Sequence, residues 1–334
     1  MLKYRRRTLP DLSHLVPDIF YVMCGARGET SNRLMPALPQ IRFLGFEPDT
    51  EEYARLTQNP DPAFRYFNVA VGDQDGSRKL YVTRNPACSS LFPPNYGFQK
   101  QFKDGATTFE IVAETSVNLV SLDSYLPAHG VKRIDILDLD TQGNELEILR
   151  GARDLVRAGV VVVRTEVEFS ELYQRQPLFG NVDAFLRDLG FMLFDLSCSR
   201  YRREKFPAKM LTRGQLLWGN ATYLRNHEAI GDKQGLFRLA LLAAHLQFHD
   251  YALEVMDSVL GGAASLSAQE ATGLKKAREQ YLRDLRSSAW WVNMIYGLES
   301  VGLKRPVKLA GRLTKQLSDR LRKDRLMTES SWED

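Results

Sequence analysis

The chain has 334 residues, 44% of them apolar and 26% charged, which excludes a disulfide-stabilised miniprotein and a mostly disordered chain. Residues 1–7 carry a net charge of +4 and residues 302–325 carry +7, so the rest of the chain carries −7 within a total of +4. A mildly acidic body with basic ends argues against a protein that binds nucleic acid along its face, so we expect no nucleic-acid partner.

The short apolar runs of the first 230 residues predict strands, because each is bounded by turn-forming residues. Residues 84–109 instead predict a long loop, since they contain Pro86, Pro93, Pro94, Gly97 and Gly105. Loops of this length are usually lids or binding loops, and we expect its aromatic side chains to close over a substrate. The predicted strands are 19–24, 42–47, 64–71, 79–83, 134–139, 160–163, 191–196 and 216–224.

Helical spacing of apolar residues between these runs predicts helices over 49–58, 144–158 and 181–189, with Asp49 as the N-cap of the first. The alternation of strands and helices predicts an α/β fold, with a doubly wound, mostly parallel sheet, helices on both faces and an antiparallel edge. Strand patterns end near residue 230, after which three helices are predicted. We expect a basic arm (1–16), an α/β domain (17–228) and a helical annex (229–334).

The annex helices are predicted over 234–260, 268–286 and 307–323. The last places leucines four residues apart among nine basic residues, a pattern that suits weak contact with an anionic membrane surface or packing on the annex. Packing is favoured because the apolar stripe is narrow. His245 and His249 have metal-ligand spacing on a predicted helix, but no third ligand is evident, so we expect helix packing and no metal site.

Cysteine usage and the N-terminal region predict a cytoplasmic protein, with the inner membrane surface as the alternative location. Cys24, Cys88 and Cys198 are an odd number and lie far apart, so they form neither a disulfide framework nor a zinc spacing. Pro10 and Pro17 interrupt the region where a signal peptide would need an apolar stretch. The sequence indicates no oligomeric state.

Residues that follow the first and second predicted strands are candidates for binding a nucleoside, since ligands of doubly wound sheets sit at the carboxyl ends of strands. The loop Gly25-Ala26-Arg27-Gly28-Glu29 lets the backbone approach a ligand closely, although it lacks the G-x-G-x-x-G pattern of dinucleotide-binding proteins. Glu47 is placed to accept hydrogen bonds from two ribose hydroxyls. The alternative, an acid that opens the helix before Pro48, is less favoured.

The segment after the strand 134–139, Asp140-Thr141-Gln142-Gly143-Asn144-Glu145, is the most distinctive in the chain. Asp140 can accept a proton from a substrate hydroxyl or face a cationic centre, and Gly143 allows a tight turn. Asp135 and Asp138 of the strand itself are interpreted as solvent-facing. Glu166 and Glu168 share one face of the next strand, and could join Asp140 around a pocket or lie on the surface.

Residues 134–153 (IDILDLDTQGNELEILRGAR) resemble the signature of the FkbM-type methyltransferases, which are class I S-adenosylmethionine-dependent enzymes. Residues 43–55 and 68–81 resemble the ribose and adenine segments, and Ser89-Ser90-Leu91 resembles a loop motif of the same family. The resemblance spans about residues 17–226. It implies a seven-stranded Rossmann-like sheet, S-adenosylmethionine as cofactor, and methyl transfer to a hydroxyl of a glycan or other small-molecule acceptor.

We predict catalytic roles for Asp140, as the base or orienting group, and for Glu166, which could join it around the pocket. The predicted cofactor-binding residues are Gly25, Ala26, Gly28, Glu47, Pro48, Ala70, Asp140, Gln142 and Gly143. Of these, the resemblance implies Gly25, Glu47, Ala70, Asp140, Gln142 and Gly143, which match the family pattern.

The chain departs from the family pattern at four positions: Met23 replaces the usual Asp, Glu29 the second loop glycine, Asp138 the usual Lys, and Gln142 the commoner Glu. These departures keep open the alternative of a binding or scaffold protein without turnover. A nicotinamide oxidoreductase is disfavoured because the chain lacks the dinucleotide-binding glycine pattern.

Overall fold

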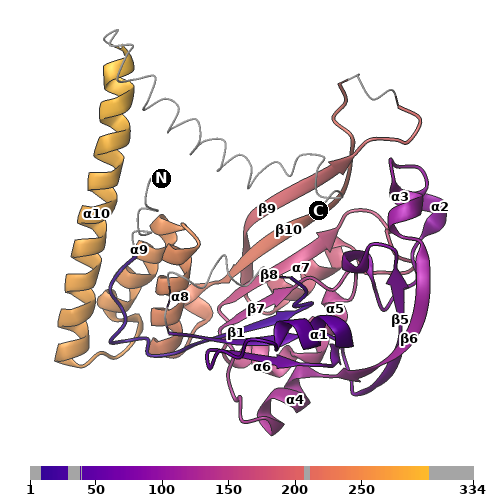
Figure 1. Ribbon diagram of the computed structural model, residues 1–334. Helices are drawn as coiled ribbons and strands as arrows, with labels where there is room; N and C mark the ends of the chain where they lie inside the picture. Colours follow the sequence, from indigo (N-terminus) through magenta and orange to yellow (C-terminus); the bar gives the residue numbers. More distant parts are fainter. Residues whose placement is uncertain (1–8, 29–37, 39, 207–210, 301–334) are drawn as a thin grey trace. The chain divides into compact units, whose positions relative to one another are not determined.

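The computed structural model describes residues 9–28, 38, 40–206 and 211–300, with the backbone alone described for 288–300 (Figure 1). These residues form two compact units. One is residues 17–229, and the other combines residues 9–16 with 230–300. The described part of the predicted N-terminal arm therefore belongs to the helical unit.

The larger unit is built on a seven-stranded sheet whose strand order is β3-β2-β1-β7-β8-β10-β9. β10 runs antiparallel to both neighbours and the other strands run parallel, so the antiparallel strand lies one place in from the edge. The order reverses between β1 and β7, which opens a crevice at their carboxyl ends. The strands are β1 Ile19–Cys24, β2 Ile41–Phe46, β3 Phe64–Phe67, β7 Ile136–Leu139, β8 Val162–Glu168, β9 Phe191–Tyr201 and β10 Gln215–Arg225.

One face of this sheet supplies the main hydrophobic core. Alternate strand residues, among them Val22, Leu137 and Val163, are fully buried against four helices. Strands of a parallel sheet have nearly continuous apolar sequences because both faces of such a sheet are buried. These strands are therefore easy to predict from the sequence. The helices are α4 Leu122–Ala128, α5 Glu145–Gly151, α6 Arg153–Ala158 and α7 Phe179–Asp188.

The helix predicted over 144–158 is two helices, α5 and α6, that meet at Ala152. Gly151 lies against the backbone of Gly72, and a Cβ added to Gly151 would lie 2.1 Å from the Gly72 carbonyl oxygen. The first N–H groups of α6 are capped from α4, since the Asp123 carboxylate accepts from the N–H of Asp154 and of Leu155, both at 2.9 Å. The helical spacing of apolar residues continues across the break because both helices pack into the same core.

A second, three-stranded sheet has the order β4-β6-β5, formed by Ala70–Val71, Ile111–Val120 and Gly76–Thr83. The strand predicted over 64–71 divides at Asn68, whose side-chain amide donates to the carbonyls of Glu47 (2.9 Å) and Pro48 (3.2 Å). β6 was not predicted as a strand: residues 112–116 are exposed, and apolar residues do not alternate with polar ones over that half. The predicted loop 84–109 contains three short helical turns: Pro86–Cys88, α2 Tyr96–Gln99 and α3 Gly105–Thr108.

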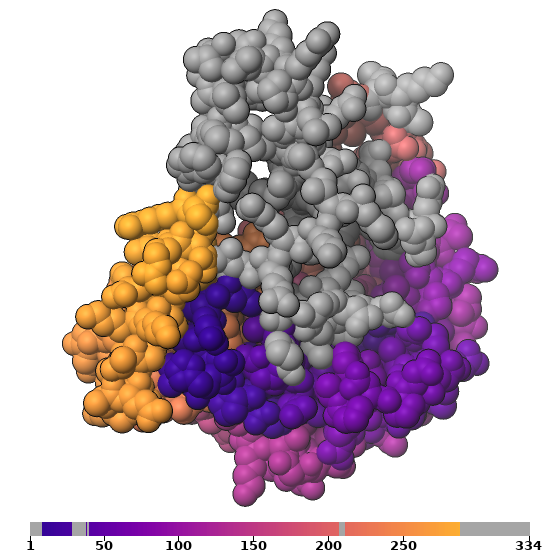
Figure 2. All heavy atoms as spheres, turned by 60° about the vertical axis from the view of Figure 1, so that its left-hand side comes forward, coloured from indigo at the N-terminus to yellow at the C-terminus, as the bar shows by residue number. Residues whose placement is uncertain are grey.

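The smaller unit contains α8 Lys233–His245, α9 His249–Ser258, a π-helical turn Val259–Ala263 and α10 Ala268–Ser300. The single helix predicted over 234–260 is wrong, since Gln247 adopts φ +72° and ends α8. Residues 9–16 belong to this unit (Figure 2), and a Cβ added to Gly273 would lie 2.7 Å from Nε2 of His14. The predicted basic helix 307–323 lies outside the described residues.

The two histidines with metal-ligand spacing lie on different helices, His245 at the end of α8 and His249 at the start of α9. Nδ1 of His249 is hydrogen-bonded to the hydroxyl of Tyr281 at 2.6 Å. The described part of the chain contains no group of three or more His, Cys, Asp or Glu side chains arranged to hold a metal ion. Within that same part, none of the helices combines the length and apolar character that crossing a membrane requires.

Candidate active site

The register of the central strands brings the predicted site residues to one level at the carboxyl edge of the sheet. Cys24, the last residue of β1, is paired with Phe46 of β2 on one side and with Leu139 of β7 on the other. The residues that follow these three, Gly25, Glu47 and Asp140, therefore leave the sheet side by side. Sequence reasoning placed all three at strand ends, and the structure confirms that placement.

Gly25 is required where β1 meets β7. Its φ is +81°, and an added Cβ would lie 1.8 Å from the carbonyl oxygen of Asp140. The N–H of Gly25 donates to the Phe46 carbonyl at 3.1 Å, and the N–H of Asp140 donates to the Cys24 carbonyl at 3.0 Å. Both the positive φ and the close approach exclude side chains at position 25.

A cavity opens at this edge and collects six of the predicted cofactor-binding residues: Gly25, Glu47, Pro48, Ala70, Asp140 and Gln142. Its apolar wall comes from β2, the small sheet and the segment after it: Phe46, Val69, Ala70, Val71, Leu80, Val82 and Leu91. A purine ring suits such a wall, and the acids that also border the cavity suit hydroxyl donors and a cationic centre. Of the wall, only Ala70 was singled out from the sequence, because the small sheet was not foreseen.

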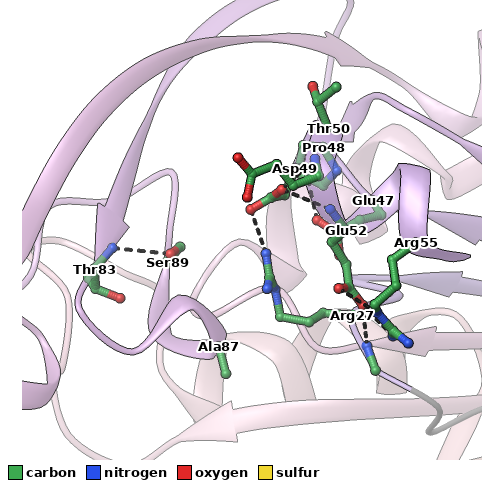
Figure 3. A network of polar contacts seen from close by, with 12 residues as sticks. Arg27, Glu47, Pro48, Asp49, Thr50, Glu52, Arg55, Thr83, Ala87 and Ser89 are labelled. Carbon is green, nitrogen blue, oxygen red and sulfur yellow. Dashed lines mark hydrogen bonds and ion pairs between the residues drawn. The ribbon is translucent and has the colours of Figure 1, made fainter.

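Glu47 is almost fully buried, with 4% of its surface exposed, and it borders the cavity. Oε1 accepts a hydrogen bond from the N–H of Asp49 at 2.9 Å (Figure 3). Burial raises the pKa of Glu47 to about 7, since desolvation disfavours the carboxylate. The two interpretations of Glu47 therefore combine: it braces the entry to α1 Thr50–Leu56 and presents a carboxyl group to the cavity.

The loop after β1 is tied to the N-terminus of α1. Nη2 of Arg27 forms an ion pair with Oδ2 of Asp49 at 2.6 Å (Figure 3). The N–H of Gly28 donates to Oε1 of Glu52 at 2.9 Å. Oδ1 of Asp49 caps α1 as predicted, accepting from the N–H groups of the first turn. Gly28 borders a neighbouring groove, and Ala26 is buried; neither borders the cavity.

The turn after β7 is organised by one carboxylate. Glu145 accepts from the N–H of Thr141 (2.8 Å), the hydroxyl of Thr141 (2.9 Å) and the N–H of Gly143 (3.0 Å). Burial raises the pKa of Glu145 to about 7. Gly143, with φ +105°, is buried and does not border the cavity, so its predicted cofactor contact becomes a role in shaping the turn.

Gln142 connects the carboxyl groups of the site. Its Nε2 donates to Oδ1 of Asp140 at 3.0 Å and to Oε2 of Glu166 at 2.6 Å, while the hydroxyl of Tyr173 lies 2.9 Å from its Oε1. Asp140 is open to the cavity, yet protein surrounds it closely enough that desolvation raises its pKa. Burial, and then the charge of Asp140, raise the pKa of Glu166.

Glu166 and Glu168 are both buried and neither borders the cavity, so the surface alternative is wrong for both. Glu166 stands behind Gln142 and reaches Asp140 only through that amide. The interpretation of Asp135 and Asp138 as solvent-facing is also wrong. Asp138 pairs with Nη1 of Arg164 at 2.9 Å, and buried Asp135 accepts from the N–H of Phe20 at 2.8 Å.

The segment 84–109 contributes to the cavity through its first residues. Ala87, Ser89 and Ser90 border it, and the Ser90 hydroxyl donates to the Gln142 carbonyl at 2.6 Å. The aromatic residues expected to form a lid do not border the cavity. Phe92 and Phe98 pack in a separate cluster around Tyr173.

Cavity residues that the sequence did not single out for binding include Arg27, Asp49 and Asn144. Arg27 was visible only as part of the glycine loop and Asp49 only as a helix cap. Nδ2 of Asn144 donates to the Val71 carbonyl at 2.7 Å, which joins the turn after β7 to the small sheet. No local sequence pattern predicts that contact, because the two residues are 73 positions apart in the chain.

Two of the departures from the family pattern are neighbours in the sheet. Met23 and Asp138 are paired in register between β1 and β7, and the charge of Asp138 is matched by Arg164 on the next strand. Neither residue borders the cavity, so these substitutions leave its lining unchanged. The third departure, Glu29, lies outside the described residues.

Comparison with known proteins matches residues 24–193 to the methyltransferase FkbM domain, just over half of the chain. The chain belongs to this family. The matched segment begins at the end of β1 and ends in β9, so it contains every described element that borders the cavity. The protein is a methyltransferase whose cofactor is S-adenosylmethionine, as the resemblance implied.

Similar proteins include the 2-O-methyltransferase NoeI of Sinorhizobium fredii, 26% identical over 188 residues, and the methyltransferase sdnD of Sordaria araneosa, 27% identical over 207. Each alignment covers 54% of this chain and 76% of the relative. A solved FkbM methyltransferase from Methylobacillus flagellatus has a TM-score of 0.36 and 13% identity. That match covers 66% of this chain and 48% of the solved chain, about half its length.

The cavity fits the cofactor of this family. Gly25 borders it, Glu47 offers a carboxyl group for ribose hydroxyls, and the wall around Ala70 is apolar, as an adenine ring requires. Asp140 and the turn that holds it border the same cavity.

Proposed function

We propose that this protein transfers the methyl group of S-adenosylmethionine to a hydroxyl group of a sugar, glycan or other small molecule. The similarity to a 2-O-methyltransferase supports a hydroxyl acceptor. The observation that carries the proposal is the position of Asp140, a carboxyl group of raised pKa that is open to the same cavity as Glu47 and Gly25. A site for hydroxyl methylation needs a proton acceptor next to a nucleoside site.

In this proposal, the residues around the cavity have separate roles. Glu47 holds the ribose, and the apolar wall around Ala70 holds the base. When bound, the cofactor supplies an electrophilic methyl group, so the protein has to align an acceptor oxygen with it. Asp140 accepts the proton that the acceptor hydroxyl loses, while Gln142 fixes the direction of its carboxyl group. Glu166 acts through Gln142 as a positioning residue rather than touching the acceptor.

Methyl transfer from radiolabelled S-adenosylmethionine tests this proposal directly. The acceptors should be a panel of oligosaccharides with free sugar hydroxyls, beside a matched panel of amines. We expect label in hydroxyl acceptors, and we expect Asp140→Asn to lower kcat by about 100-fold or more while the Kd for S-adenosylhomocysteine changes by less than about threefold.

Glu114→Gln is the matched control, because Glu114 is an exposed acid on β6, paired with Lys79 and away from the cavity. It should leave kcat unchanged. Label that enters the amines alone, or an Asp140→Asn enzyme that is as active as the wild type, would contradict the proposal.

A further inference from the structure

The charged residues that border the cavity are unevenly balanced. Glu47, Asp49 and Asp140 bring three carboxyl groups, and Arg27 brings the positive charge among the described lining residues. S-adenosylmethionine carries a carboxylate of its own at its amino-acid end. Placed in this cavity, that carboxylate would be repelled by three acids and attracted by one guanidinium.

Arg27 is held so that it can bind an anion. Asp49 pairs with Nη2 of Arg27 at 2.6 Å, and the other oxygen of Asp49 is committed to capping α1. The side chain of Arg27 is 31% exposed, and a guanidinium presents five N–H donors, so one pair with Asp49 leaves capacity for a second carboxylate. Figure 3 shows Arg27 extended between the loop after β1 and Asp49.

The loop that carries Arg27 is braced on both sides of it. Gly25 and Ala26 donate to the Phe46 carbonyl at 3.1 and 3.0 Å, and the N–H of Gly28 donates to Glu52 at 2.9 Å. Hydrogen bonds from Arg55 lower the pKa of Glu52 to about 2, so this brace persists across the neutral range. The guanidinium is therefore positioned before any ligand arrives, which reduces the entropy lost on binding.

We propose that Arg27 selects the amino-acid end of the cofactor by pairing with its α-carboxylate, while Asp49 holds the guanidinium from the other side. The inference rests on S-adenosylmethionine as cofactor and adds a specificity-determining residue that no family pattern pointed to. An arginine–carboxylate pair is directional and charge-assisted, and partial burial weakens its screening by water.

Titration calorimetry with two ligands isolates this pair. S-adenosylhomocysteine carries the amino-acid part, and 5′-methylthioadenosine is the same nucleoside thioether without it. We expect Arg27→Gln to weaken binding of S-adenosylhomocysteine by about tenfold or more and to change binding of 5′-methylthioadenosine by less than about twofold. Arg27→Lys keeps the charge and should retain part of the preference for S-adenosylhomocysteine.

Arg187→Gln is the matched control, because Arg187 is an exposed arginine of α7, pairs with Asp183 and does not border the cavity. It should bind both ligands as the wild type does. Equal weakening of both ligands by Arg27→Gln, or a complete loss of preference in Arg27→Lys, would overturn the inference. A wild-type protein that binds neither ligand would instead overturn the cofactor assignment, and the inference with it.

Discussion

The side-chain amide of Gln142 holds together two carboxyl groups that would otherwise repel each other. Its NH2 group donates to both Asp140 and Glu166, and the hydroxyl of Tyr173 beside Oε1 orients the amide. An ionised glutamate at this position would have no donor to offer either group. Gln142 therefore explains how an acid at the cavity and a buried acid behind it stay close.

Glu47 predicts a pH dependence of cofactor binding. Its pKa is about 7, and ribose hydroxyls donate to the carboxylate, so binding requires the deprotonated form. Below pH 7 a proton must leave before the ligand binds. The association constant for S-adenosylhomocysteine should therefore rise up to about tenfold per pH unit toward pH 7 and level off above it.

Calorimetry between pH 5.5 and pH 8.5, a range of about three units around that pKa, measures this dependence. Glu47→Gln has no proton to lose, so it should bind more weakly and without the rise. If the variant kept the full slope, another cavity group would be responsible. Asp140, whose pKa is also raised, would then be the candidate.

At the scale of elements, α6 begins where a side chain from another helix accepts hydrogen bonds from its first N–H groups. Asp123 of α4 accepts from two of them, and Gly151 ends α5 against the backbone of Gly72. The break turns the segment after Asp140 so that both helices reach the core beneath the sheet. The site depends on it only indirectly, since neither α6 nor Asp123 borders the cavity.

Asp123→Ala should therefore lower stability without changing ligand binding. Loss of a cap of this kind lowers the free energy of unfolding by about 1 kcal/mol. Urea unfolding would show this as a lower midpoint, while the Kd for S-adenosylhomocysteine stays constant. Asp154→Ala removes an exposed acid from the first turn of α6 but leaves the cap, and should change stability by less than about 0.5 kcal/mol. Equal effects of the two variants would show that the contacts of Asp123 contribute nothing.

At the scale of the whole molecule, the family match and the cavity both fall within residues 17–229, and α8, α9 and α10 belong to the other unit. A ligand stabilises only the cooperative unit that it binds. S-adenosylhomocysteine at 100 times its Kd adds about 2.7 kcal/mol to that unit.

Hydrogen exchange followed by mass spectrometry should show this division. Amides of the larger unit that exchange by opening of the whole unit should slow by about 100-fold with ligand, those of Gly25 and Gly143 among them. Amides in α8 and α9 should exchange at unchanged rates. Equal slowing in both units would show that they unfold together, contrary to this expectation.

Much of the fold and part of the site were predictable from local patterns. The apolar runs that became β1, β2, β7 and β8 identified the central strands, because strands covered on both faces need continuous apolar sequence. Once those strands were placed, their carboxyl ends pointed to Gly25, Glu47 and Asp140, which do share a cavity. β6 gave no such signal, because its apolar residues form neither a continuous run nor a regular alternation, so the small sheet and the wall that it supports were missed.

The amino-acid sequence by itself determined the fold class, the family and the residues at the strand ends, because each depends on the local order of apolar and polar side chains. Only the tertiary structure decided what the polar groups do. It buried Asp138 against Arg164, placed Glu166 behind Gln142, and set Arg27 at the cavity beside Asp49. The physical reason is that a buried charge takes its role from the partner that compensates it, and these partners lie 22 to 26 residues away along the chain.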